Sequence, residues 1–207
     1  MDNNSNNLHL FTYGIFMSLA DAVIPRTVSL AEIYGNVMYY GALDQYTDEY
    51  LIMILNYFPV PLAVPVAQML ELAAEEFIPP QGRNQREAAD TQENPLFVLL
   101  TPEDRFRILT LLERTETGLI GEAFLQEYPG LVSAISSLIR YTMLGYYSEW
   151  FGYGSTRLEA PNQRTLQYHP ISWEQVGYPG PSFSYIAEVQ QYYQLRRGAE
   201  INNYLGR

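Results

Sequence analysis

The sequence predicts an all-α protein: a helical bundle-like domain with one long, ordered loop near the C-terminus that is rich in glycine, proline and aromatic residues. Before residue 147, apolar residues recur at helical spacing in segment after segment. Strand signals are weak, because no segment alternates cleanly and no Asn-Gly hairpin turn occurs. The stretch from Gly145 to Pro181 holds both tryptophans among closely spaced glycines and prolines, which forbid a long helix or a central strand.

Proline and glycine delimit the expected helices of the first half. Apolar residues at helical spacing predict helices over residues 8–24, 29–40, 44–58 and 65–78. Ser29 followed by Glu32 is the capping-box arrangement at the start of the second of these helices. Pro65 is expected in the first turn of the fourth helix, where an α-helix tolerates the missing N–H.

A polar linker, residues 79–95, is expected to separate these helices from the rest of the body. Thr101 and Pro102 then mark a strong helix start, with a capping hydroxyl and a proline in the first turn. The run from Gly130 to Tyr147 is the most hydrophobic segment. It predicts one central helix that leads directly into the aromatic loop.

We therefore expect a single domain that spans residues 1–207. Its helical body covers residues 8–147 and includes the polar linker. Residues 148–207 form the aromatic loop and a C-terminal segment with a last helix near residues 184–193. A long loop that carries many aromatic side chains is typical of an ordered, functional segment, because disordered linkers are poor in aromatic residues.

The charge balance argues against several classes of partner and enzyme. The formal net charge is −11, and all 12 basic residues are arginine. A nucleic-acid-binding face needs clustered positive charge, and an anionic membrane surface repels an acidic protein. Without lysine, Schiff-base and phosphate-loop lysines are excluded, and without cysteine so are disulfides, thiolate metal sites and iron–sulfur clusters.

No targeting or membrane-spanning segment is predicted. Residues 1–7 are polar and acidic, whereas a secretory signal begins with a basic region, and no paired arginines precede the first apolar run. The most apolar stretches are short or interrupted by proline. We expect a cytoplasmic protein with no direct membrane insertion, and export together with a partner stays open.

Motifs for independent catalysis are weak. His9 and His169 lie far apart and have no ligand-pair spacing, and no serine stands in a Gly-x-Ser-x-Gly turn. The Gly-Tyr-Gly at residues 152–154 matches the start of a dinucleotide-binding fingerprint, but it lacks the third glycine and follows an expected helix. The sequence therefore predicts no catalytic, cofactor-binding or metal-binding residue.

The aromatic loop carries the candidate binding residues. Tyrosine and tryptophan offer a large contact area with a polar tip, which is typical of interface anchors, and stacking on a sugar or a flavin is the alternative. Arginine in the loop favours either ion pairs that fix the loop or a contact with a partner. The residues that we expect at a partner interface are Trp150, Tyr153, Arg157, Trp173, Tyr178, Pro179 and Gly180.

Two parts of the chain resemble the gluconate 2-dehydrogenase subunit 3 family, the small gamma subunits of multi-subunit sugar dehydrogenases. Residues 19–25 are similar to an early helix of the family that ends in Ile-Pro. The more distinctive part is Trp-Glu-Gln-Val-Gly-Tyr-Pro-Gly-Pro at residues 173–181, which resembles the family's Trp-x-x-Ile-Gly-Tyr-Pro-Gly segment. A glycine-rich stretch at residues 152–155 and a helix over residues 100–112 also match the family's order of features.

The resemblance implies a non-catalytic accessory subunit that stabilises or assembles the large flavoprotein of a gluconate or sugar dehydrogenase complex. No cofactor is then expected in this chain, FAD is expected in the large partner subunit, and a cytochrome c subunit is a further expected partner. Many members carry a twin-arginine export signal, which this sequence lacks. Residues 158–171 also make the spacing between the two glycine segments longer than is usual in the family.

Two other interpretations remain open. The main alternative is a free-standing binding protein for a sugar or another small polar ligand, with tyrosines as a stacking platform. An independent enzyme is the third, and it requires a metal or cofactor that purifies with the protein. An isolated subunit would also be able to hide its aromatic side chains by forming a homo-oligomer.

Overall fold

The computed structural model describes residues 3–77, 94–114 and 126–180. Within these residues every regular element is helical, which confirms the predicted all-α class. The elements in chain order are α1 (Asn3–Val23), α2 (Val28–Tyr34), η1 (Asn36–Tyr39), η2 (Ala42–Gln45), α3 (Thr47–Asn56), α4 (Ala63–Phe77), α6 (Leu96–Leu99), α7 (Pro102–Arg114), α9 (Leu131–Ile135), α10 (Leu138–Tyr147), η4 (Phe151–Thr156), η5 (Pro161–Gln163) and α11 (Ile171–Val176). The expected helix at residues 184–193 and all of the expected linker before residue 94 lie outside the described residues.

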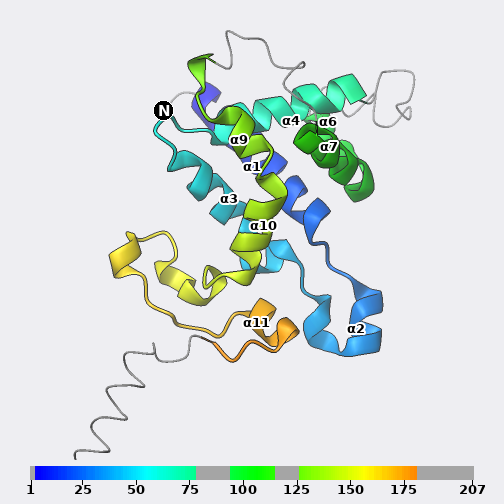
Figure 1. The fold of residues 1–207 in the computed structure, drawn as a ribbon, viewed down its shortest axis with the longest axis vertical. Helices are drawn as coiled ribbons and strands as arrows, with labels where there is room; N and C mark the ends of the chain where they lie inside the picture. Colours follow the sequence, from blue (N-terminus) through cyan, green and yellow to red (C-terminus); the bar gives the residue numbers. More distant parts are fainter. Residues whose placement is uncertain (1–2, 78–93, 115–125, 181–207) are drawn as a thin grey trace, which may run out of the picture.

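Helix α1 runs through the middle of the body (Figure 1) and packs against α3, α4 and α7. Its residues Ile15, Phe16 and Leu19 are completely buried. They form one apolar stripe because residues three and four apart lie on the same helix face. Burial of each such side chain contributes about 1.5–3 kcal/mol to folding, so α1 is the main organiser of the core.

The short helix α6 is held at both ends by charged side chains of the body. At its N-terminus, the carboxylate of Glu71 accepts hydrogen bonds from the backbone N–H groups of Leu96 (2.6 Å) and Phe97 (3.0 Å). At the other end, the guanidinium of Arg105 donates to the backbone carbonyl groups of Phe97 and Val98. Each charge has the sign that its end of a helix favours, which explains how four residues keep a helical turn.

Three predicted helix boundaries are wrong. Helix α2 begins at Val28, with no side-chain capping bond, and it ends at Tyr34 rather than continuing to residue 40. The helix expected from residue 44 begins only at Thr47, because Tyr46 adopts a left-handed conformation (φ 53°) between η2 and α3. The central helix expected over residues 130–147 is divided at residues 136–137 into α9 and α10. Serine hydroxyls compete for backbone hydrogen bonds there, since Ser136 donates to the carbonyl of Ser133 at 3.1 Å.

Residues 27–40, which we call the arm, leave the body and return to it. At the base of the arm its two ends lie side by side: the backbone N–H of Ala42 donates to the carbonyl of Ile24 (2.8 Å) and that of Thr27 to the carbonyl of Tyr39 (3.3 Å). Gly41 is required at this close approach, because a Cβ atom on it would lie 2.6 Å from the carbonyl oxygen of Ile24. Figure 1 shows α2 apart from the other helices of the body.

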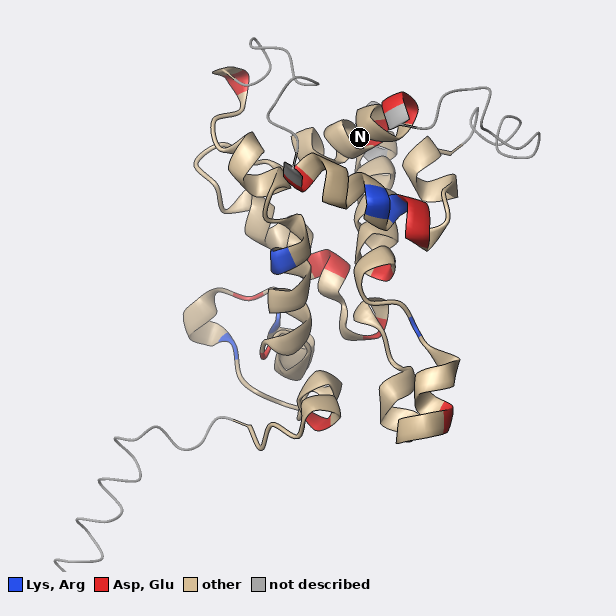
Figure 2. Cartoon of the chain, turned by 45° about the vertical axis from the view of Figure 1, so that its right-hand side comes forward, with Lys and Arg blue, Asp and Glu red and all other residues tan. Residues whose placement is uncertain are grey.

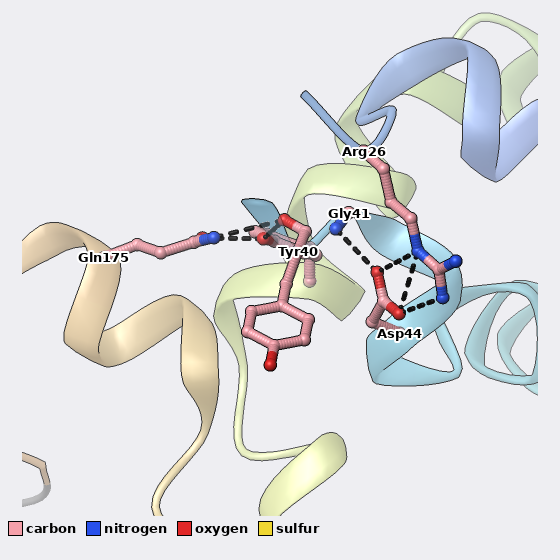
Figure 3. A network of polar contacts seen from close by, with 6 residues as sticks. Arg26, Tyr40, Gly41, Asp44 and Gln175 are labelled. Carbon is pink, nitrogen blue, oxygen red and sulfur yellow. Dashed lines mark hydrogen bonds and ion pairs between the residues drawn. The ribbon is translucent and has the colours of Figure 1, made fainter. Parts of the chain in front are cut away.

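An ion pair closes the base of the arm. Arg26 and Asp44 form a two-pronged ion pair, and the carboxylate of Asp44 also accepts a hydrogen bond from the backbone N–H of Gly41 at 2.9 Å (Figure 3). Burial alone would raise the pKa of Asp44, but the hydrogen bonds from Arg26 and Gly41 and the charge of Arg26 outweigh it and lower this pKa. The arm therefore starts and ends at a fixed point of the body.

Among the described helices, none alone is long and apolar enough to cross a membrane. Residues 7–23 and α2 meet the length and composition criteria only when taken together, as a pair bent by 40°. The apolar stripe of α1 is buried against the other helices of the body.

Candidate functional site

Residues 148–180, which we call the aromatic segment, cover one end of the helical body (Figure 1). They follow α10 directly, as expected, and contain only the short helices η4, η5 and α11. The segment folds back on itself at its glycine-rich turn, where Gln167 and Tyr168 both donate backbone N–H groups to the carbonyl of Gly152. A Cβ atom on Gly152 would lie 2.6 Å from the carbonyl oxygen of Tyr168, so this close approach requires glycine.

Trp150 fixes the start of the aromatic segment to the body. Its side chain is 1% exposed, and its indole N–H donates a 2.7 Å hydrogen bond to the backbone carbonyl of Tyr46. The ring of Tyr50 packs edge-on against it at 5.5 Å between ring centroids. The guanidinium of Arg164 lies 5.6 Å from the indole and 6.0 Å from the ring of half-buried Tyr153, so the second half of the segment closes over the first.

Trp173, on α11, fixes the end of the segment in the same way. It is 3% exposed, and its indole N–H donates to the backbone carbonyl of Tyr147 at 2.9 Å. Tyr178 and His169 pack edge-on against the indole at 4.9 and 5.5 Å. Gly180, with φ 95°, brings the chain back beside the same ring. The two indoles therefore hold the segment at both ends.

Arg157 ties the glycine-rich turn to α3. Its guanidinium forms a two-pronged ion pair with Glu49 at 2.7 and 3.0 Å and donates to the carbonyl of Gly154 at 3.0 Å. The same group lies 4.0 Å from the centre of the Tyr46 ring. Hydrogen bonding to Glu49 raises the pKa of Arg157, so the charge is permanent. These contacts fix both the loop and the orientation of the guanidinium.

A polar network joins α10, α11 and the arm. The hydroxyl of Tyr146, on α10, lies 2.8 Å from the carbonyl oxygen of Tyr40 and 2.6 Å from Oε1 of Gln175, and it donates its single hydrogen to one of them. The amide nitrogen of Gln175 donates to the carbonyl groups of Val37 (2.8 Å) and Tyr40 (3.1 Å) (Figure 3). Burial raises the pKa of Tyr146, and hydrogen bonding to Gln175 opposes this shift. The end of the arm is therefore held against α11.

The arm exposes an apolar surface that the sequence analysis did not identify. None of the residues of α2 and η1 is buried. The exposed apolar side chains on this part of the chain are Val28, Leu30, Ile33, Tyr34, Tyr39 and Tyr40. The neighbouring end of the aromatic segment adds Val176 and Tyr178. The signal that was available is that α2 has only seven residues, of which Val28, Leu30, Ile33 and Tyr34 are apolar and large, so that one short helix cannot bury all of them against the body.

Charged residues are sparse on this surface, as Figure 2 shows. Glu32 is the charged residue of the arm, and Glu174 is that of α11. An apolar surface with so few charges matches the buried centre of protein interfaces, from which charged residues are depleted.

A separate shallow pocket of about 270 Å³ lies at the glycine-rich turn. Its rings form a row, with centroids 6.3 Å apart for Tyr46 and Phe151 and 6.5 Å apart for Phe151 and Tyr168. The residues that line it are Tyr46, Phe151, Gly154, Ser155, Arg157 and Tyr168.

The structure distributes the seven expected interface residues over three environments. Buried within the chain are Trp150, Trp173 and Gly180; half-buried are Tyr153 and Arg157; exposed are Tyr178 and Pro179. The two indoles act on the body of this same chain, so only the outer residues of the set are accessible to another molecule. Tyr178 and Pro179 lie at the α11 end, next to the arm, and Arg157 lies at the pocket.

Comparison of the sequence with models of protein families, with curated proteins and with solved structures gives no match. Within the described ranges, no group of three or more histidine, aspartate and glutamate side chains is placed to hold a metal ion.

Proposed function

We propose that this chain is a non-catalytic small subunit of a flavin-dependent gluconate or sugar dehydrogenase, in which it binds and stabilises the large flavoprotein subunit. FAD belongs to that large subunit, and a cytochrome c subunit is a further component of the complex. The resemblance of residues 173–181 to the gamma subunits of such enzymes supports the proposal.

The observation that carries the proposal is the uncovered arm. Helix α2 has only seven residues and buries none of them, although a helix this short is not stable by itself in water. Ile33 is 70% exposed and Tyr34 is 68% exposed. A partner that covers these side chains gains about 1.5–3 kcal/mol for each large apolar side chain that it buries fully. Burial of several of these side chains together would stabilise the contact between the two subunits.

The exposed end of α11 extends the same surface. Gln175 hydrogen-bonds to the arm, and Val176 and Tyr178, on either side of Gly177, remain exposed. The segment that resembles the gamma subunits thus lies beside the arm. Because this combined surface carries few charges, the matching surface of the flavoprotein is expected to be apolar and nearly uncharged as well.

Affinity purification of the tagged chain from its native host tests the proposal. We expect a yellow eluate with flavin absorbance, and mass spectrometry is expected to find a large flavoprotein together with the chain. Ile33→Glu should remove the flavoprotein from the eluate, because it places a charge in the apolar contact. Leu158→Glu is the matched control, since Leu158 is 68% exposed but lies outside the surface.

A colourless wild-type protein that elutes without a flavoprotein would contradict the proposed function. Equal co-elution with the Ile33→Glu and Leu158→Glu variants would keep the function but reject the arm as the contact. Trp173→Ala is unsuitable for this test, because Trp173 is 3% exposed and its loss changes the stability of the segment.

A further inference from the structure

We infer that the pocket at the glycine-rich turn, lined by Tyr46, Phe151, Ser155, Arg157 and Tyr168, binds a neutral monosaccharide. This site is independent of the proposed subunit contact, because its lining residues are separate from the exposed residues of the arm and α11.

The first support is a strained residue at the pocket. Tyr46 has a positive φ of 53°, and it is the one non-glycine residue among those described that does so. A bulky residue in this conformation stores strain and persists only where surrounding contacts hold it. Its carbonyl accepts a hydrogen bond from Trp150, while the residue as a whole remains 42% exposed and lines the pocket.

The other end of the row of rings, at Tyr168, depends on a glycine. Gly154 has φ 50° and ψ −120°, and a Cβ atom there would lie 2.4 Å from Oε1 of Gln167 and 2.6 Å from the ring of Tyr168. The side chain of Gln167 also fixes the turn, because its Oε1 accepts a hydrogen bond from the backbone N–H of Ser155 at 3.1 Å. The ring of Tyr168 is thereby placed beside Phe151 although it is mostly exposed.

The polar group of the pocket is a guanidinium whose charge is already balanced. Glu49 takes the Nε–H and one Nη2–H of Arg157, and the carbonyl of Gly154 takes one Nη1–H. Of the five N–H groups of an arginine, the other two have no acceptor among the residues that the structure describes. Because Glu49 already balances the charge of Arg157, a second carboxylate here would be repelled by Glu49, and the donors favour a neutral oxygen such as a hydroxyl.

The aromatic walls select the shape and polarity of the ligand. The face of an aromatic ring carries negative potential and attracts the positively polarised C–H groups of a sugar ring. Arg157 already covers one face of the Tyr46 ring, at 4.0 Å from its centre, so Phe151 and Tyr168 supply the open wall, and their tilt of 43° makes this wall bent. A bent wall with two spare donors fits one puckered polyhydroxyl ring better than a flat aromatic ligand.

Saturation-transfer NMR on the full chain tests this inference with a panel of D-glucose, D-galactose, D-mannose and D-xylose. For so small a ligand at an open site we expect a Kd on the order of 1 mM for at least one of these sugars. Tyr168→Ala should weaken that binding by about tenfold, and Tyr168→Phe should retain it, because the ring supplies the contact. Tyr57→Ala is the matched control, since Tyr57 is 64% exposed and lies outside the pocket.

D-Glucuronate tests the charge argument, because it has the ring of glucose with a carboxylate in place of the C6 hydroxymethyl group. It should bind no more tightly than glucose. The inference is overturned if none of the four neutral sugars gives saturation transfer at about 10 mM. It is overturned equally if Tyr168→Ala binds them as well as Tyr57→Ala does, or if glucuronate is the preferred ligand. Circular dichroism of each variant checks that the fold is retained.

Discussion

The indole N–H of Trp150 lies 2.7 Å from the backbone carbonyl oxygen of Tyr46, and this hydrogen bond joins the aromatic segment to the start of α3. The same carbonyl also accepts the backbone N–H of Tyr50 at 3.3 Å, so both of its lone pairs are used. Tyr46 is held in its left-handed conformation where these contacts meet. The position of the candidate pocket therefore depends in part on a contact between residues far apart in the chain.

We expect Trp150→Phe to lower the free energy of unfolding by about 1–3 kcal/mol, because it removes one donor from the partly buried carbonyl of Tyr46 and part of a buried, packed ring. Urea denaturation measures the change as a shift in midpoint at constant slope. Tyr57→Phe is the control and should stay within about 0.5 kcal/mol of the wild type, since Tyr57 is an exposed residue. An unchanged midpoint for Trp150→Phe would show that the hydrogen bond does not hold the segment.

Gly154→Ala is expected to destabilise the protein more than Gly177→Ala. Both glycines have positive φ, so both substitutions carry backbone strain. At Gly177 a Cβ atom meets nothing within 4 Å, whereas at Gly154 it collides with Gln167 and Tyr168. The expected cost is about 1–2 kcal/mol at Gly177 and more at Gly154. Thermal or urea denaturation of the two variants gives the comparison, and equal losses would contradict the tight contact between the two halves of the turn.

The course of the helices was largely predictable because proline and glycine mark their ends. Pro25 follows α1, Pro65 lies in the first turn of α4, and Pro102 begins α7, as the sequence analysis expected. The breaks at Tyr46 and at residues 136–137 were not predictable, because local sequence favours a continuous helix at both places. The break at Tyr46 coincides with a contact to Trp150 that sequence periodicity does not reveal.

The contributions of two carboxylates, Asp44 and Asp48, to the stability of the fold should change with pH in opposite directions. Asp48 is 4% exposed, and burial raises its pKa, although hydrogen bonding from Tyr13 opposes the shift. Its contribution to stability is therefore most favourable below the unfolded-state pKa of about 3.9 and decreases as pH rises through the folded-state value. Asp44 has a lowered pKa, so its stabilising contribution is present above about pH 3.9 and is lost as pH falls through the folded-state value.

Urea denaturation of Asp48→Asn and Asp44→Asn between about pH 3 and pH 7 measures these contributions. Relative to the wild type, Asp48→Asn should become more favourable as pH rises, because the wild type alone then has to ionise a buried carboxyl group. Asp44→Asn should become less favourable over the same range, because only the wild type gains the ionised pair with Arg26. Slopes of the same sign would show that at least one of the two environments is assigned incorrectly.

The candidate site was predictable as a segment but not as a surface. Its dense aromatic, glycine and proline residues identify residues 145–181 as an ordered loop, and most of it is described in that form. Which aromatic residues face inward depends on whether a carbonyl of the body meets each indole N–H, as those of Tyr46 and Tyr147 do. The arm was missed because an apolar helical pattern is normally the mark of a buried face, and here the fold leaves that face uncovered.

Hydrogen exchange provides a direct test of the arm in the free chain and in the proposed complex. In the free chain, the amides of α2 and η1 should exchange much faster than those of α1, because none of the residues of α2 and η1 is buried. In a complex with the flavoprotein, exchange in the arm should slow strongly, since opening the arm would then require breaking the apolar contact. The short helix η5 is the internal control: it also buries no residue but lies outside the proposed surface, so it should exchange fast in both states.

Slow exchange of the arm in the free chain would mean that the arm is stable without a partner. Fast exchange in a verified complex would place the contact elsewhere, and the outer residues of the aromatic segment would then be the next candidates.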